Sequence, residues 1–215
     1  MKRFCLFAVF LCCFLLLSGA ESANPYEIFI DGDEATLYLI EGGQCVQKFR
    51  CAVGKPDTPS PIGTFYITEK AHWGSGFGGR WLGINCKWGK FGIHGTIFPN
   101  SIGWSSSHGC FRMLNKDVEK LYDIVPVGTK VTVAFGVYGD FGNGFRYIKP
   151  GGYGSDVMRI QKRLAELGYY NGSIDGRYMS LTQNALNKYQ RDNGLTVTNT
   201  VTPALQEHMG FVLME

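Results

Sequence analysis

The sequence predicts a mainly β domain, sandwich-like or barrel-like, followed by a small all-α three-helix domain. Between residues 25 and 135, short runs of β-branched and aromatic residues alternate with turn residues. From residue 153 to 212, apolar residues recur at helical spacing instead. The segment between them, residues 136–152, contains six glycines and one proline. We therefore interpret 136–152 as a glycine-rich linker between two domains.

The first domain contains strand-like runs that end at turn residues such as Asp31-Gly32 and Gly42-Gly43. This spacing is typical of a meandering antiparallel sheet. One helix is expected after Asn115, which is a suitable N-cap residue. The expected strands cover residues 26–30, 35–40, 45–53, 63–68 and 130–135.

The second domain is expected to hold three short helices. The first is predicted to be capped by Ser155, and the second to begin with a capping box formed by Ser180 and Gln183. The third is predicted to follow Thr202, because a proline comes directly after it. No residue pattern in these helices suggests a reaction.

The first twenty residues have the features of a secretory signal peptide. Lys2 and Arg3 precede an apolar run at residues 4–17, and a small-residue cleavage site ends at Ala20. Fourteen apolar residues are short for a membrane span, which needs about 20. We expect cleavage after Ala20 and an extracytoplasmic location, secreted, in the cell wall or in the periplasm. An uncleaved N-terminal anchor is the alternative.

The charge balance does not favour nucleic acid as a partner. The chain has 21 basic and 18 acidic residues, a net charge of +3, and removal of residues 1–20 leaves it close to neutral. A nucleic-acid-binding domain would carry a much larger basic excess. We expect an exported monomer without stable membrane insertion after signal cleavage.

Four cysteines remain after the signal segment: Cys45, Cys51, Cys86 and Cys110. An oxidising compartment permits disulfides. Cys45 and Cys51 lie in one expected strand, where a separation of six residues spans about 20 Å and prevents a bond between them. The disulfide state of Cys45, Cys51 and Cys86 otherwise stays open.

Two histidines and one cysteine form the strongest candidate for chemistry. His94 precedes Gly95, and Cys110 follows His108-Gly109. A thiol becomes a good nucleophile when an imidazole takes its proton. The flanking glycines allow a substrate carbonyl to approach the backbone closely, and successive N–H groups near Cys110 are candidates for an oxyanion hole.

Two other interpretations of these residues stay open from the sequence alone. The histidines are buried and structural in the first, and the cysteine is inert. In the second, His94, His108, Cys110 and Cys86 bind zinc, although they lack the paired spacing of a structural zinc site.

The ordered motifs resemble the catalytic domain of the L,D-transpeptidases (YkuD type). The motif is His-Gly-Thr at 94–96 followed by Ser-His-Gly-Cys-Phe-Arg-Met at 107–113. Segments 58–65, 115–118 and 127–131 are also similar to that family. The resemblance covers about residues 25–135 and implies the L,D-transpeptidase fold for this domain.

The resemblance implies a cysteine acyl transfer on peptidoglycan, without a metal or cofactor. Cys110 would attack a stem tetrapeptide after its third residue, releasing D-alanine and forming a thioester. A side-chain amine of a second stem would then complete a 3-3 crosslink. His94 would be the general base, oriented by the Gly95 carbonyl. Water as acceptor would instead give L,D-carboxypeptidase activity.

The resemblance also assigns roles around the nucleophile. His108 and Ser107 would shape the pocket, and the N–H groups of Gly109 and Cys110 would hold the oxyanion. Arg112 would bind a substrate carboxylate or brace the site; an ordinary structural ion pair is the alternative.

The helical segment resembles a peptidoglycan-binding domain of the PG_binding_1 type. The similar residues include Gly154-Ser155-Asp156-Val157, Leu167-Gly168-Tyr169 and Ile174-Asp175-Gly176. Such a domain would bind the cell wall and raise the local substrate concentration. A non-catalytic wall-binding protein is therefore the alternative function.

Three further features leave questions for the structure. Trp104 and Phe111 are bulkier than expected beside the nucleophile, and Tyr178-Met179-Ser180 replaces an expected glycine. Residues 73–79 contain four glycines around aromatic residues. They form a surface loop or a mobile lid over the site.

Overall fold

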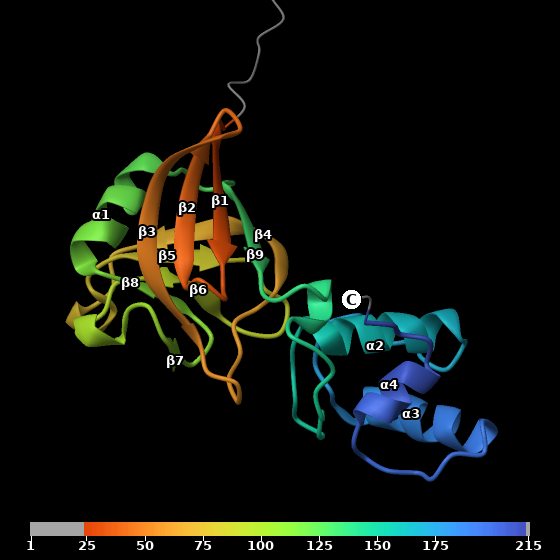
Figure 1. The fold of residues 1–215 in the computed structure, drawn as a ribbon. Coiled ribbons are helices and arrows are strands. Elements are labelled where there is room, and N and C mark those ends of the chain that lie inside the picture. Colours follow the sequence, from red (N-terminus) through yellow and green to blue (C-terminus); the bar gives the residue numbers. More distant parts are fainter. Residues whose placement is uncertain (1–23, 214–215) are drawn as a thin grey trace, which may run out of the picture.

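The computed structural model describes residues 24–213 and contains a β unit followed by a helical unit (Figure 1). The expected signal peptide, residues 1–20, lies outside the described residues. The strands are β1 (Tyr26–Asp31), β2 (Thr36–Glu41), β3 (Gln44–Gly54), β4 (Gly63–Ala71), β5 (Trp81–Ile84), β6 (Phe91–His94), β7 (Ser105–Ser107), β8 (Phe111–Met113) and β9 (Lys130–Ala134). The helices are α1 (Asn115–Ile124), α2 (Ser155–Glu166), α3 (Ser180–Asp192) and α4 (Pro203–His208), with short 3₁₀ turns at Ser75–Phe77, Pro99–Ser101 and Gly139–Phe141.

The strands form a barrel-like sheet in the order β2-β1-β9-β4-β5-β6-β8-β3-β7, which a β2–β3 pairing closes. The mainly β class is confirmed, but the expected antiparallel meander is wrong. Three strand pairs, β1–β9, β6–β8 and β3–β7, are parallel. Parallel neighbours require a crossover connection, and turn residues in the sequence do not reveal which distant strands such connections bring together.

The core of the β unit forms because alternate residues of each strand point inward. Val131 and Val133 of β9 are buried, and Val131 pairs with Ile28 of β1 and Phe65 of β4. Helix α1 covers one side of the sheet, where it buries Val118 and Leu121 (Figure 1). The apolar spacing of α1 therefore serves packing against the sheet.

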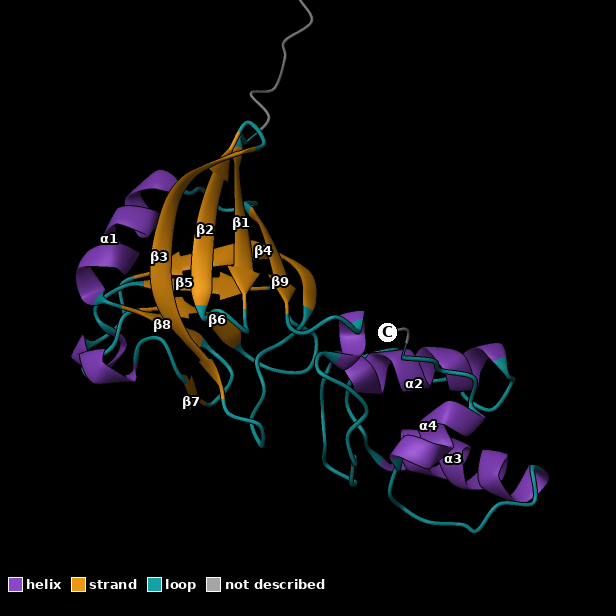
Figure 2. Cartoon of the chain, in the orientation of Figure 1, coloured by secondary structure: helices purple, strands orange, loops and turns teal. Residues whose placement is uncertain are grey.

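The helical unit has its own core, and α2, α3 and α4 surround it (Figure 2). Its twelve buried residues include Ile148 and Val201, which pair through a short backbone bridge. Ile148 lies within the segment 136–152, so part of this segment packs against the helices. Phe141 of the same segment contacts the rings of Phe145 and Phe211.

Three of the four expected helix caps are wrong. Asn115, Ser155 and Ser180 are the first residues of their helices, and no side chain caps these helices. Thr202 does cap α4, because its hydroxyl accepts a hydrogen bond from the Leu205 N–H. Asn115 and Ser155 use their side chains for contacts with distant segments instead, and such contacts cannot be recognised from local sequence.

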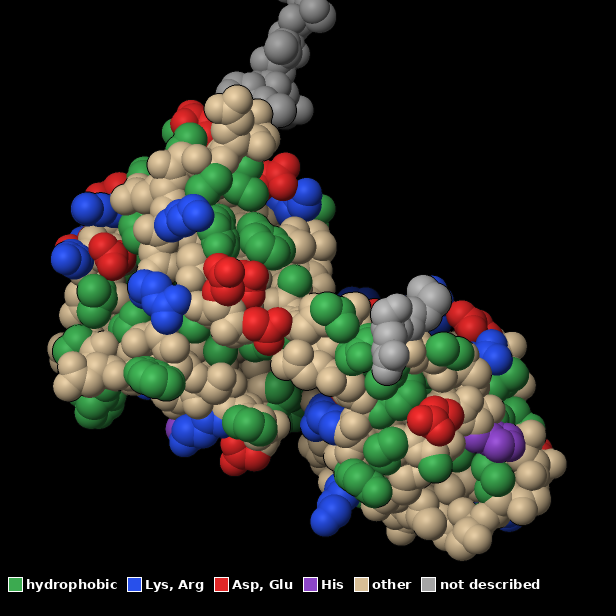
Figure 3. Space-filling model, in the orientation of Figure 1, with side chains coloured by type: hydrophobic (Ala, Val, Ile, Leu, Met, Phe, Trp, Pro, Cys, Tyr) green, Lys and Arg blue, Asp and Glu red, His purple; other side chains and the backbone are tan. Residues whose placement is uncertain are grey.

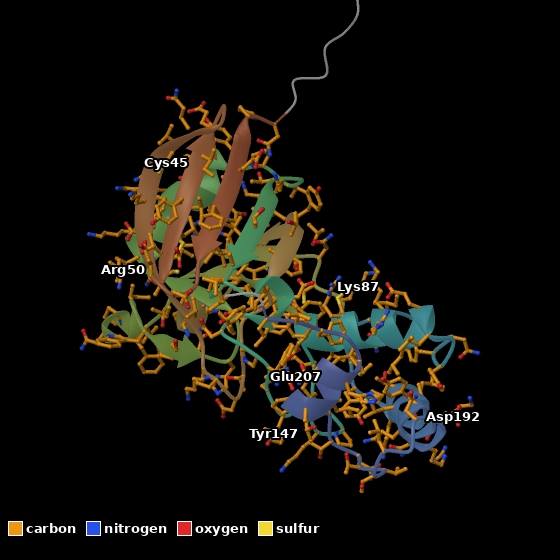
Figure 4. All side chains as sticks on the ribbon, turned by 45° about the vertical axis from the view of Figure 1, so that its right-hand side comes forward. Cys45, Arg50, Lys87, Tyr147, Asp192 and Glu207 are labelled. Atoms are coloured by element: carbon orange, nitrogen blue, oxygen red, sulfur yellow. The ribbon has the colours of Figure 1, made fainter. Side chains whose placement is uncertain are left out.

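All four cysteines in the described residues are free thiols. Cys45 and Cys51 both lie on β3, as the sequence predicts. Figure 4 shows Cys45 near the end of the β unit that lies away from the helices. Within residues 24–213, no helix is both long enough and apolar enough to cross a bilayer.

We expect Val131→Ala to destabilise the β unit by about 2 kcal/mol, because it removes two buried methyl groups from the middle of the sheet. The matched variant is Val46→Ala on β3, since Val46 is 51% exposed. It should cost less than about 1 kcal/mol. Urea unfolding followed by tryptophan fluorescence measures both, and equal losses would contradict this account of the core.

Candidate active site

The parallel pairing of β6 with β8 brings His94 and Cys110 together from distant parts of the sequence. Ile93 pairs with Phe111, and His94 pairs with Arg112. Cys110 directly precedes β8 and lies beside Gly92, whose backbone interacts with its thiol. Gly92 and His94 are two residues apart in one strand, so they face the same side of the sheet. Cys110 therefore lies directly before β8 and next to β6, the strand that ends with His94.

The imidazole of His94 is buried and held in one orientation. Its Nδ1 lies 2.6 Å from the carbonyl oxygen of Gly95. A carbonyl only accepts hydrogen bonds, so Nδ1 carries the proton and Nε2 has the free lone pair. Burial lowers the pKa of His94, and the positive charge of Arg112 lowers it further, while the bond to Gly95 opposes both effects. His94 is thus neutral near pH 7, with Nε2 able to accept a proton.

Aromatic side chains surround His94. The ring of Phe77 meets the imidazole edge-on at 5.1 Å, and Trp81 lies 5.8 Å away. Trp73 stacks on Trp81 at 4.2 Å with almost parallel planes. Residues 73–79 thus lie against the histidine, and the interpretation of this loop as a mobile lid stays a hypothesis.

The loop before Cys110 is held by its own serine. The hydroxyl of Ser107 donates to the Cys110 carbonyl at 2.6 Å and accepts from the Gly109 N–H at 3.0 Å. The expectation that the Gly109 N–H holds an oxyanion is therefore at odds with the structure, since Ser107 already occupies that donor. The Cys110 N–H makes no hydrogen bond to the described part of the chain and stays free for that role.

The thiol of Cys110 is half-buried and protonated at rest. Burial raises the pKa of Cys110, while the Gly92 backbone and the charge of Arg112 act in the opposite direction. The pKa of His94 is lowered at the same time. These two directions favour a neutral thiol beside a neutral imidazole over a thiolate–imidazolium pair. Such a pair reacts by transferring the proton as the thiol attacks.

Arg112 lies on β8 with its guanidinium next to the same loop. It donates to the carbonyl oxygen of Ser106 at 2.6 Å. Among residues 24–213 it forms no ion pair, so the alternative of an ordinary structural ion pair is wrong for the described chain. A guanidinium that bonds only to a backbone carbonyl keeps further donors for an anionic group.

His108 is exposed and lies in a bend, not in a strand. The structure therefore does not place it on a regular strand face beside Cys110. The zinc interpretation also finds no support, because nowhere in residues 24–213 do three or more His, Cys, Asp or Glu side chains form a group able to hold a metal ion.

Two segments match known protein families. Residues 25–133 match YkuD, the L,D-transpeptidase catalytic domain, and residues 153–209 match PG_binding_1, a peptidoglycan-binding domain. This chain belongs to the L,D-transpeptidase family. The first match covers the β unit with β6 and β8, and the second covers α2, α3 and α4.

Relatives of this chain are known from bacilli. The protein named L,D-transpeptidase YkuD of Bacillus subtilis is 43% identical over 110 residues, which are 51% of this chain and 66% of that protein. Its Bacillus licheniformis counterpart is 42% identical over 122 residues, 55% of this chain and 73% of that protein. A crystal structure of a mutant Enterococcus faecium L,D-transpeptidase is 25% identical, with a TM-score of 0.46 over 51% of this chain and 49% of that one.

Sequence reasoning missed Asn115, which fastens the His94 segment of this L,D-transpeptidase. Its side-chain oxygen accepts from the Thr96 N–H at 2.8 Å. A Cβ at Gly78 or Gly95 would lie 2.1 or 2.5 Å from that oxygen, so both positions require glycine. The sequence suggested only a helix cap, and the local pattern contains no signal for the longer-range contact. The sequence likewise places Phe77 in a glycine-rich loop and gives no sign of its contact with His94.

The bulky residues noted in the sequence take different positions. Phe111 is fully buried in the core beneath the site, whereas Trp104 is 68% exposed. Trp81 and Trp88 are both buried and pack inside the β unit. The replacement at Tyr178 adds a buried tyrosine to the helical unit, where its hydroxyl donates to the Asn199 carbonyl.

We expect His94 to titrate below about 6.5, the ordinary histidine pKa, because its site disfavours the charged form. The unfolded chain then binds a proton that the folded chain does not, so stability falls as the pH drops below about 6.5. NMR titration of the histidine ring signals measures this pKa, with His94→Gln identifying the resonance. Titration above the ordinary value would contradict the burial argument.

Proposed function

We propose that this chain is an extracytoplasmic cysteine L,D-transpeptidase that acts on peptidoglycan. The observation that carries the proposal is that Cys110 directly precedes β8 and lies beside β6, the parallel neighbour that ends with a neutral His94. The membership of the β unit in the L,D-transpeptidase family supports it. The substrate we propose is a stem tetrapeptide with a diamino acid at its third position.

The first step forms a thioester. Nε2 of His94 takes the proton of the Cys110 thiol as the sulfur attacks the carbonyl carbon of the third residue. The bond between that carbon and the D-alanine nitrogen then breaks, and His94 returns the proton to the leaving amine. The bond from Nδ1 to the Gly95 carbonyl supports this role, because it keeps Nε2 free.

The second step transfers the acyl group. The side-chain amine of a second stem attacks the thioester, His94 accepts a proton from that amine, and the thiol of Cys110 is regenerated. The product is a 3-3 crosslink. Water in place of the amine releases a tripeptide, which is the L,D-carboxypeptidase alternative, and the geometry of His94 and Cys110 serves both acceptors equally.

The neighbouring groups support the reaction in different ways. The Cys110 N–H is the proposed oxyanion donor, because it has no partner within residues 24–213. Arg112 is the proposed site for a substrate carboxylate, and we propose that exposed His108 contacts the substrate beside it. Ser107 holds the loop through its bonds to Gly109 and Cys110, so its role is to keep the backbone in place.

We propose that the remaining parts of the chain determine where the enzyme acts. Residues 1–20 direct export, residues 25–135 form the catalytic domain, and residues 136–152 lead to the peptidoglycan-binding domain at 153–212. The family match of the helical unit supports peptidoglycan as its ligand. Binding the wall raises the effective concentration of stem peptides at Cys110. We propose a monomer that uses no metal or cofactor.

We expect the purified protein to release D-alanine from a disaccharide tetrapeptide and to form a crosslinked dimer, both detected by mass spectrometry. Cys110→Ala should lower the rate at least about a thousandfold, because it removes the nucleophile. Cys45→Ala is the matched control. Cys45 is an exposed free thiol on β3 and should be replaceable without loss of activity.

Two results would contradict the transpeptidase proposal in different ways. A wild-type protein no faster than Cys110→Ala would favour a non-catalytic wall-binding protein. D-alanine release with no dimer, even with excess acceptor, would favour the carboxypeptidase alternative.

We also expect a carbapenem to acylate Cys110, because the thiol attacks the strained lactam carbonyl as it would the substrate carbonyl. Intact-mass spectrometry under reducing conditions should show a single adduct on the wild type and on Cys45→Ala. Cys110→Ala should show none. An adduct that maps by peptide mass spectrometry to Cys45 or Cys86 would argue against a specially reactive Cys110.

A further inference from the structure

The helical unit is docked against the β unit, although the two form separate lobes in the space-filling view (Figure 3). Ser155, the first residue of α2, accepts from the Ile62 N–H at 3.0 Å and donates to the Ile62 carbonyl. Trp88 of the β unit packs on Gly176 so closely that a Cβ there would lie 2.6 Å from its ring. These two contacts join the helical unit to the β unit, and we call this region the junction.

A third contact at the junction leads to the nucleophile. Tyr153 packs against the core of the β unit, with its ring centroid 6.3 Å from that of Phe91. Phe91 is the first residue of β6 and is buried. Its ring lies against Gly109, where a Cβ would be 2.4 Å from Phe91 Cε1. Tyr153, Phe91 and Gly109 therefore form a continuous series of contacts that ends one residue before Cys110.

The junction reaches the same loop by a second route. Segment 58–62 holds the loop at one end, because the Thr58 hydroxyl donates to the Ser107 carbonyl at 3.1 Å. The Pro59 carbonyl also lies close to Gly109. At its other end, the segment bonds to Ser155 through Ile62. The helical unit therefore reaches the loop directly through Phe91, and indirectly through Ile62 at the far end of segment 58–62.

The hydrogen bond from its N–H to Ser107 holds Gly109 on one side only, so the contact with Phe91 adds a second constraint. Its φ of +108° lies in a region open to glycine, and a glycine has no side chain that packs to hold it there. The ring of Phe91 supplies the surface against which Gly109 rests. Tyr153 in turn restricts the position of Phe91.

We propose that Tyr153 is a positioning residue that sets the placement and reactivity of the Cys110 thiol through Phe91 and Gly109. The helical unit then does more than bind the wall, because it completes the support of the nucleophile loop. This inference rests on the proposed function only in taking Cys110 as the nucleophile.

The decisive experiment compares the full-length wild type with Tyr153→Ala, Tyr153→Phe and Tyr147→Ala. Tyr147 is the matched control, since it is 67% exposed on the helical unit (Figure 4). The rate of Cys110 alkylation by iodoacetamide is measured across pH by peptide mass spectrometry. Turnover of a soluble disaccharide tetrapeptide is measured in parallel, because this substrate does not depend on binding to an insoluble wall.

We expect Tyr153→Ala to change the rate of Cys110 alkylation or the pH midpoint of that rate. It should also lower kcat about tenfold with KM little changed, because a small displacement of a reacting group has an effect of this order or larger. Tyr153→Phe keeps the ring and should restore wild-type behaviour. Tyr147→Ala should match the wild type. If Tyr153→Ala does not fold by circular dichroism, Tyr153→Leu replaces it and is judged by the same criteria.

The outcomes separate this inference from the proposed function. A Tyr153→Ala protein with wild-type alkylation and wild-type kcat overturns the inference, even if the variant acts poorly on insoluble sacculi, because that pattern indicates wall binding alone. The wild type could instead transfer no acyl group while Tyr153→Ala still alters the alkylation of Cys110. That result supports the positioning role of Tyr153 but overturns the transpeptidase proposal.

Discussion

The parallel pairing of β6 with β8 is the constraint on which the site depends. It places Cys110, directly before β8, next to the strand that ends with His94, although the two residues are sixteen positions apart in the chain. A parallel pair cannot be joined by a tight turn, so the chain must leave the end of β6 and return to the start of β8. Residues 95–110 make that return. The two motif segments, 94–96 and 107–113, lie at its two ends.

The backbone around the pair is held by polar side chains that do not themselves react. Ser107 ties Gly109 to Cys110, and Asn115 ties the segment after His94 to the start of α1. Both act over short distances inside the β unit. Asn115 also requires glycine at positions 78 and 95, where a Cβ would collide with its side-chain oxygen.

Contacts at the junction connect the helical unit to the residues that support the Cys110 loop. Ser155 bonds to the backbone of Ile62, and Tyr153 packs on Phe91. A wall-binding domain on a flexible tether would act only through local concentration. The docked helical unit also presents a fixed surface to the β unit, where Tyr153 packs on Phe91 and the ring of Phe91 lies against Gly109.

Local sequence determined the mainly β unit, the three later helices and the motif residues His94 and Cys110, because alternation, helical spacing and short motifs depend on near neighbours. It did not determine that β6 pairs in parallel with β8, that Asn115 and Ser155 bond across the fold instead of capping helices, or that Ser107 occupies the Gly109 N–H. Those outcomes depend on which distant segments meet. The same is true of the pKa directions at His94 and Cys110, since burial and neighbouring charge arise only when the chain has folded.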